Sequence, residues 1–283
     1  MPIAPAADPT ALADAATLAS WLAAAAALLA SVTVAAWGWR RHREGAPIVP
    51  GIAWPKAEWN GVETLLIAFC WLILVAVAVA MLPASATLVD RMAAQAAGSI
   101  VATMALVALL RLHGVSWRSI GLSSEDLTLD WRLAVASLLL VTGPLLVVSA
   151  LLDGVVKYEH PVIDGLTGDH RWGAIAVVAI TAVIAAPLAE EFFFRRILLG
   201  WLDARFPSHG GRIAIGASAI LFGLSHWGQG LAWVPLVGLG VVLGELAYRR
   251  GSLMAAILLH GLFNAVSVMI LLMQILGGQL RGG

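Results

Sequence analysis

The chain has 283 residues, of which 60% are hydrophobic and 12% charged, and its mean hydropathy is +0.90. A soluble domain carries charge on about a quarter of its residues, so this chain has too few charges to cover a surface facing water and is expected to lie in a bilayer. Its formal net charge is zero, which argues against a nucleic-acid partner, because such a partner requires a basic face.

Eight apolar segments approach or exceed the length of about 20 residues that a helix needs to cross the hydrocarbon region. Backbone polar groups in lipid must pair internally, which leaves helices or a closed barrel, and runs this long without alternation are not barrel strands. The sequence therefore predicts an all-α fold, a polytopic transmembrane helical bundle of about eight helices. The segments are 16–39, 61–83, 92–111, 133–152, 172–202, 212–227, 231–247 and 251–276.

The first segment, 16–39, is rich in alanine and less apolar than the second. Because the first twenty residues contain no Lys or Arg, we expect a retained helix here rather than a signal peptide. Between the first two segments, residues 44–60 contain Pro47, Pro50 and Pro55, which predicts a loop.

Lys and Arg residues gather in alternate loops, and loops of this kind face the cytoplasm. The loop after the fourth segment instead carries acids, namely Asp153, Glu159, Asp164 and Asp169 beside Lys157 and Arg171. The pattern predicts a multi-pass protein of the cell (inner) membrane with both termini outside. The basic residues of the cytoplasmic loops are Arg40, Arg41, Arg43, Lys56, Arg111, Arg118, Arg132, Arg205, Arg212, Arg249 and Arg250.

Several polar side chains fall inside the apolar segments, where ionisable groups are costly and are by default functional candidates. At 1.5 Å per residue from the nearest arginine at the loop, Glu190, His226 and Asn264 lie at a depth of about 21–23 Å, and His260 at about 15 Å. Similar depth on three helices predicts one shared, buried site. Its candidate members are Glu190, Glu191, Arg195, His226, His260 and Asn264. Arg196 is a further charge within the fifth segment, without an assigned role.

The spacing within each helix suggests how these side chains pair. Glu191 and Arg195 are four residues apart and face one another, whereas Glu190 points about 100° away and is free to face a cavity. Pro187, one turn earlier, is expected to bend the helix and free a carbonyl group. By the same spacing, His260 shares a helix face with Asn264.

The patterns E-E-x-x-x-R at Glu190, Glu191 and Arg195, F-x-x-x-H at Phe222 and His226, and H-x-x-x-N at His260 and Asn264 occur in this order. Together they resemble the motifs of the CPBP family of intramembrane proteases, which includes CAAX prenyl proteases and the Abi-like, bacteriocin-processing proteins. The resemblance covers roughly residues 170–270. It implies an endopeptidase acting on membrane-associated peptides or proteins.

By this resemblance, Glu190 and His226 would activate the attacking water, His260 and Asn264 would stabilise the oxyanion, and Glu191 with Arg195 would hold the site. It also divides the chain into an N-terminal tail (1–15), N-terminal transmembrane helices with their loops (16–165), a catalytic core (166–276) and a C-terminal tail (277–283). The motifs contain no serine or cysteine nucleophile, which favours direct attack by water over a covalent acyl-enzyme.

A metal ion is the main alternative within this chemistry. Glu190, His226 and His260 are residue types that bind catalytic zinc, and relatives are often described as metalloproteases. The zinc motif H-E-x-x-H is absent from the sequence, and we favour chemistry without a metal cofactor.

Two other classes of function fit a membrane protein with buried polar groups. A proton- or ion-coupled transporter would use them as a relay, but it commonly shows internal repeats, whereas here the polar residues all lie in the C-terminal half. A non-catalytic scaffold or immunity protein on the same fold is the second alternative, and the intact motifs argue against it.

Overall fold

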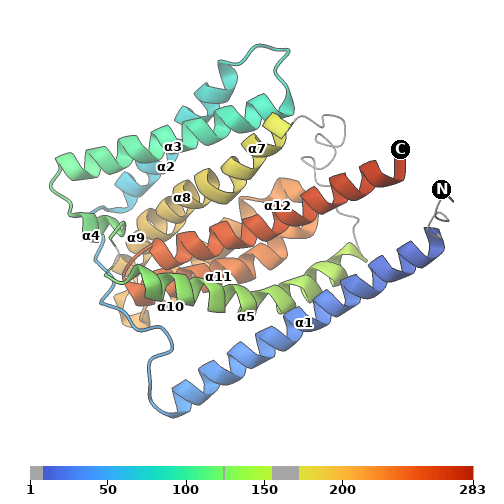
Figure 1. Ribbon diagram of the computed structural model, residues 1–283. Coiled ribbons are helices and arrows are strands. Elements are labelled where there is room, and N and C mark those ends of the chain that lie inside the picture. The colour runs from blue at the N-terminus through green and yellow to red at the C-terminus, as the bar shows by residue number, and fades with distance from the viewer. Residues whose placement is uncertain (1–8, 124, 155–171, 283) are drawn as a thin grey trace.

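The computed structural model describes residues 9–123, 125–154 and 172–282, and over this part of the chain it is a helical bundle without strands (Figure 1). The all-α prediction is therefore confirmed. The long helices are α1 (Pro9–Arg43), α2 (Gly61–Ala80), α3 (Leu88–Leu112), α5 (Leu127–Asp153), α10 (Arg212–Leu224), α11 (Trp233–Arg250) and α12 (Met254–Gly282). The fifth predicted span is a composite of α7 (Trp172–Ile180), η1 (Thr181–Ala185), α8 (Ala186–Glu191), η2 (Phe192–Leu198) and α9 (Leu199–Arg205).

Six helical stretches of the described chain are long and apolar enough to cross a membrane, and the stretches Arg212–Leu224 and Met254–Ile270 are shorter apolar helices. Large hydrophobic side chains remain exposed along the outside of the bundle. In water this surface would be unfavourable, but in a bilayer it faces lipid. The protein is thus a multi-pass membrane protein, whereas the identity of the membrane stays a prediction.

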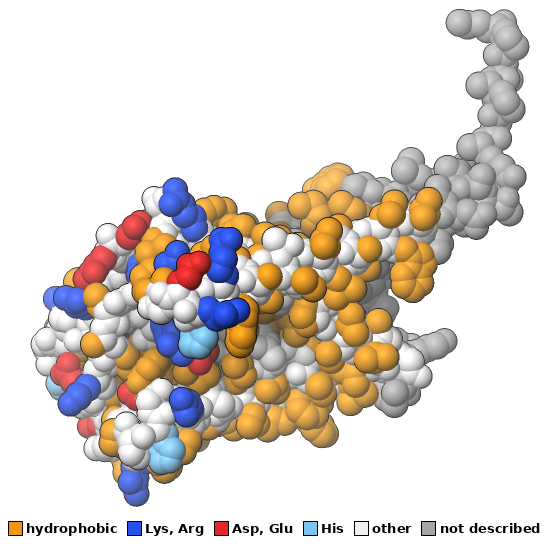
Figure 2. All heavy atoms as spheres, turned by 90° about the horizontal axis from the view of Figure 1, so that it is seen from below, with side chains coloured by type: hydrophobic (Ala, Val, Ile, Leu, Met, Phe, Trp, Pro, Cys, Tyr) orange, Lys and Arg blue, Asp and Glu red, His pale blue; other side chains and the backbone are white. Residues whose placement is uncertain are grey.

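Charged side chains gather at one end of the molecule and hydrophobic side chains along its length (Figure 2). The loops that precede α2, α5, α10 and α12 meet at this end, opposite the two chain termini (Figure 1). The predicted basic loops therefore share one end, as expected. The predicted acidic residues Glu159, Asp164 and Asp169, together with Lys157 and Arg171, lie outside the described residues.

The predicted loop 44–60 contains no helix, but part of it is held tightly against the bundle. We call residues 47–59 the strap. Arg196 donates to the carbonyl oxygens of Pro55 (3.0 Å) and Lys56 (3.1 Å), and its guanidinium carbon lies 4.6 Å from the ring centre of Trp59. The indole N–H of Trp59 in turn donates to Ile197 O at 3.0 Å. A buried arginine whose donors reach backbone carbonyls is thus the main attachment of the strap.

Arg250 makes a second attachment. It pairs with Asp130 of α5 at 2.6 Å and donates to Pro50 O at 2.7 Å, and its side chain is only 8% exposed. The depth estimate used Arg250 as a marker of the cytoplasmic interface. Its side chain does not extend into water but is buried and paired within the protein, as is that of Arg196.

A substitution at Gly51 tests this packing. A Cβ atom there would lie 1.9 Å from Arg249 O, so Gly51→Ala is expected to displace the strap and lower the free energy of unfolding by about 1–3 kcal/mol. Gly228→Ala is the matched control, because its Cβ would meet no atom within 4 Å. Thermal unfolding in detergent measures both, and equal unfolding temperatures would contradict the tight contact.

Helix α1 packs along α5 (Figure 1). The Ser31 hydroxyl of α1 donates to Leu139 O at 2.8 Å and accepts from the Gly143 N–H at 3.2 Å. These two backbone groups are i,i+4 partners in a regular α-helix. The Ser31 hydroxyl of α1 therefore bonds to both members of a backbone pair of α5, just before Pro144. Gly143 permits the approach, since a Cβ there would lie 2.6 Å from the Ser31 oxygen.

Candidate functional site

The helix that carries Glu190 and Glu191 is irregular on both sides of them. Its short α-helical piece, Ala186–Glu191, lies between two π-helical segments, η1 and η2. Such wide turns contain an extra residue and often occur at functional sites. In η2, carbonyl groups find donors on other elements, because Phe194 O accepts from Ser218 at 2.8 Å and Ile197 O from Trp59. The widened helix is thus held by its neighbours.

Glu191 and Arg195 form the predicted pair, at 3.0 Å, and both side chains are fully buried. Arg195 also donates to Gly240 O of α11 at 3.3 Å, and its guanidinium carbon lies 4.4 Å from the ring centre of Phe222. A buried ion pair needs such additional contacts to offset its desolvation. The pair therefore connects helix 172–205 to α10 and α11.

His260 of α12 faces both carboxylates. Its Nδ1 lies 2.8 Å from Glu191 Oε1, and its Nε2 lies 3.9 Å from Glu190 Oε2. Because a carboxylate accepts, we assign the Nδ1 proton to the bond with Glu191. This orients the ring and leaves Nε2 toward Glu190.

His226 lies beyond the end of its helix. The predicted span 212–227 included it, but α10 ends at Leu224. Its Nδ1 lies 2.9 Å from Phe222 O and 3.2 Å from the Ser225 hydroxyl, which itself donates to Phe222 O at 2.7 Å. A carbonyl can only accept, so Nδ1 carries the proton and the Nε2 lone pair remains free.

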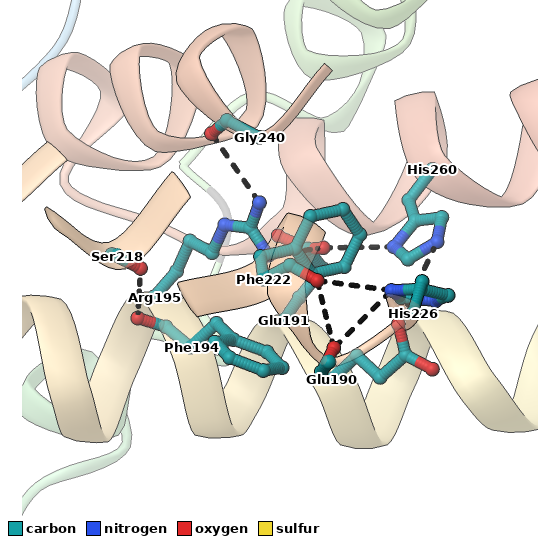
Figure 3. A network of polar contacts seen from close by, with 10 residues as sticks. Glu190, Glu191, Phe194, Arg195, Ser218, Phe222, His226, Gly240 and His260 are labelled. Carbon is teal, nitrogen blue, oxygen red and sulfur yellow. Dashed lines mark hydrogen bonds and ion pairs between the residues drawn. The ribbon is translucent and has the colours of Figure 1, made fainter. Parts of the chain in front are cut away.

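The ring of Phe222 brings the two histidines to one place. Its centre lies 5.2 Å from the His226 ring and 5.6 Å from the His260 ring, both edge to face. In Figure 3 the side chains of Glu190, His226 and His260 gather beside this ring. The F-x-x-x-H spacing thus supplies a rigid apolar wall as well as a histidine.

Glu190 differs from Glu191 in exposure and pairing. Its side chain is 23% exposed, whereas that of Glu191 is 0% exposed. The Oε2 atom of each is buried without a hydrogen-bond partner among the described residues, but Glu191 is held through its Oε1 by Arg195 and His260. Buried polar atoms are nearly always paired, so an unpaired carboxylate oxygen points to a role with water or a ligand.

Asn264 lies one turn beyond His260, as predicted, but its amide does not point to the carboxylates. Nδ2 donates to Ala182 O of η1 at 2.7 Å. The oxyanion role assigned to Asn264 by resemblance stays a prediction.

Glu190, His226 and His260 are the residues that the sequence offers as zinc ligands. Among the described residues, no group of three or more His, Cys, Asp or Glu side chains is arranged to hold a metal ion. The described side chains therefore do not fit a preformed three-ligand zinc site.

Sequence reasoning missed Ser225 and Ser218, the two hydroxyls that satisfy carbonyl groups around the site. Serines beside a histidine or within an apolar helix are too common to single out. The sequence also gave Arg196 no partner. In the structure this arginine binds the strap, and the tryptophans Trp54 and Trp59 in the strap were the residues that could have indicated the contact. The centre of Trp54 is 5.3 Å from the Arg196 guanidinium carbon.

A known protein family matches the part of the chain that carries the site. Residues 172–266 match the family described as type II CAAX prenyl endopeptidase Rce1-like. The UPF0177 protein in abiGi 5'region of Lactococcus lactis subsp. cremoris is 27% identical over 146 residues, which is 50% of this chain and 60% of that relative. The chain thus spans less than two thirds of that relative. No solved structure matches the chain.

Proposed function

We propose that the chain hydrolyses peptide bonds of membrane-associated peptides or proteins, because residues 172–266 match the Rce1-like family of type II CAAX prenyl endopeptidases. The observation that carries the proposal is the unpaired Oε2 of Glu190, 3.9 Å from His260 Nε2. A water bound to both atoms would lie to one side of them, and Figure 3 shows the His226 side chain close by.

In the proposed reaction, Glu190 removes a proton from this water while the water oxygen attacks the carbonyl carbon of the substrate. His226 accepts a hydrogen bond from the same water through its free Nε2. The tetrahedral intermediate then breaks its C–N bond, and Glu190 returns the proton to the leaving amine. One water is consumed, and the products are a carboxylic acid and an amine, which in water become a carboxylate and an ammonium group.

Glu191 and Arg195 have a different role, because both are fully buried. Glu191 fixes the His260 ring through Nδ1, and Arg195 fixes Glu191. We assign to His260 the stabilisation of the oxyanion. This role requires a doubly protonated ring, with Nδ1–H donating to Glu191 and Nε2–H donating to the oxyanion. Positioned donors of this kind usually supply the largest catalytic term.

The first experiment uses the purified protein in detergent with a library of membrane-anchored peptides. We expect cleavage by the wild type, and a rate about 10²–10⁴-fold lower for His226→Ala, because it removes the water-positioning lone pair. His209→Ala is the control, since His209 lies in the exposed loop after α9. Equal rates for both variants would overturn the role of His226.

A chelator in the same assay tests the metal question. We expect the rate to stay unchanged with excess EDTA, in keeping with water activated by Glu190. Loss of cleavage that added zinc restores would replace this mechanism with a metal-dependent one. Absence of cleavage in any form of a folded protein would instead favour transport, which a flux assay in liposomes measures.

A further inference from the structure

The carbonyl group of Phe222 lies in the last turn of α10 and accepts hydrogen bonds from two side chains. In a regular helix its donor would be the His226 N–H, but that N–H donates to Gly223 O at 2.9 Å. Phe222 O instead accepts from the Ser225 hydroxyl at 2.7 Å and from His226 Nδ1 at 2.9 Å (Figure 3). The helix end thus makes a backbone carbonyl available to the histidine ring.

The Nδ1 atom of His226 has a second oxygen neighbour, the Ser225 hydroxyl at 3.2 Å. The proton of this hydroxyl is directed at Phe222 O, so a lone pair of Ser225 Oγ remains to accept from Nδ1–H. An unprotonated Nδ1 would place its lone pair against the carbonyl oxygen with no proton between them. Two acceptors on one nitrogen therefore favour the form of the neutral ring that is protonated at Nδ1.

The choice of this form decides what His226 can do on its other side. A ring protonated at Nδ1 accepts a hydrogen bond at Nε2, whereas a ring protonated at Nε2 donates one there. In the proposed reaction Nε2 must accept from the attacking water. The contact of the His226 ring with the Phe222 ring, 5.2 Å between centres, holds the ring in place at the same time.

We propose that Ser225 is a positioning residue that, together with the Phe222 carbonyl, keeps neutral His226 protonated at Nδ1 and its Nε2 free for the attacking water. Ser225 acts through the histidine and not on the substrate. The assignment of the ring proton does not depend on the proposed function, whereas the effect of Ser225 on cleavage rests on it.

NMR of the protein in detergent, labelled with ¹⁵N at histidine, tests the assignment, because protonated and unprotonated ring nitrogens give distinct signals. The His226 signals are those missing from the His226→Ala spectrum, and they are recorded at a pH where the ring is neutral. We expect Nδ1 to be protonated in the wild type. Ser225→Ala should lower the ratio of the Nδ1–H form to the Nε2–H form about 2–10-fold, the range of one neutral hydrogen bond.

Ser208→Ala is the matched control, because the chain contains a second Ser-His pair. Ser208 Oγ lies 3.0 Å from His209 Nδ1 in the exposed loop after α9. Removal of this hydroxyl should leave the His226 signals unchanged.

The pair Ser225→Thr and Ser225→Val separates the hydroxyl from the shape of the side chain, and it keeps the test available if Ser225→Ala folds poorly. Threonine retains a hydroxyl and should restore the wild-type ratio, whereas valine, of nearly equal shape, should behave like alanine. Equal ratios in the wild type and in both variants would overturn the proposal. A wild-type His226 protonated at Nε2 alone would overturn it as well.

Peptide cleavage gives the second measurement. We expect kcat of the Ser225 variants to follow the fraction of His226 in the Nδ1–H form, with KM unchanged, because only that form accepts from the water. A kcat that does not follow this fraction would overturn the positioning role. A ratio that changes as expected, with no cleavage by any folded form, would retain the proton assignment and reject the endopeptidase.

Discussion

Glu190→Gln is expected to lower kcat/KM for peptide cleavage by about 10²–10⁴-fold, the range typical of a removed general base. The amide keeps the shape of the side chain but cannot take a proton from water. Because the Glu190 side chain is partly exposed and its Oε2 has no hydrogen-bond partner, no hydrogen bond through that oxygen is lost. The unfolding temperature should therefore stay within a few degrees of the wild type.

Glu245→Gln is the control for this substitution. Glu245 is also a membrane-helix glutamate, but its carboxylate pairs with Arg249 on the exposed face of α11. An exposed i,i+4 pair contributes about 0.3–0.5 kcal/mol, so neither cleavage nor stability should change appreciably. Normal cleavage by Glu190→Gln would remove the basis of the proposed mechanism, and a large loss in both variants would indicate a general disturbance.

Arg195→Met should produce the largest loss of stability, about 3–5 kcal/mol, because it leaves the carboxylate of Glu191 buried without its cation. Methionine fills part of the space beside Phe222 but can donate neither to Glu191 nor to Gly240 O. Thermal unfolding in detergent measures the loss. Arg249→Met, on the exposed face of α11, is the control and should unfold close to the wild type.

The double variant Glu191→Gln with Arg195→Met tests the reason for that loss. Replacing the charged acid as well removes the unpaired charge, so the double variant should be more stable than Arg195→Met alone. A double variant that is less stable would show that packing, and not the buried charge, determines the effect.

Features that follow from the geometry of a single helix could be predicted from the sequence. Long apolar runs predicted the spans, and i,i+4 spacing predicted the pair of Glu191 with Arg195, which the structure places at 3.0 Å. Counting residues from the basic loops gave Glu190 and His226 similar depths, and their side chains gather beside Phe222 (Figure 3). Each of these inferences depends on regular helical geometry alone.

The remainder depended on contacts between distant segments. A proline predicts a freed carbonyl, but the π turn decides that the carbonyl is Ala182 O and that Asn264 reaches it. Arg250 looks like an interface residue by position, and only the fold brings Asp130 to it. Regular helix geometry also placed His226 inside a helix that ends at Leu224.

The strap has a consequence for how this region tolerates change. Arg196 and Arg250 reach it through the carbonyl oxygens of Pro50, Pro55 and Lys56, groups that any amino acid provides. Side-chain identity at Lys56 is therefore of little importance, whereas chain length is critical. One residue inserted between Pro50 and Pro55 would prevent both attachments from forming at the same time. The strap therefore fixes the number of residues between α1 and α2, although its sequence resembles that of a linker.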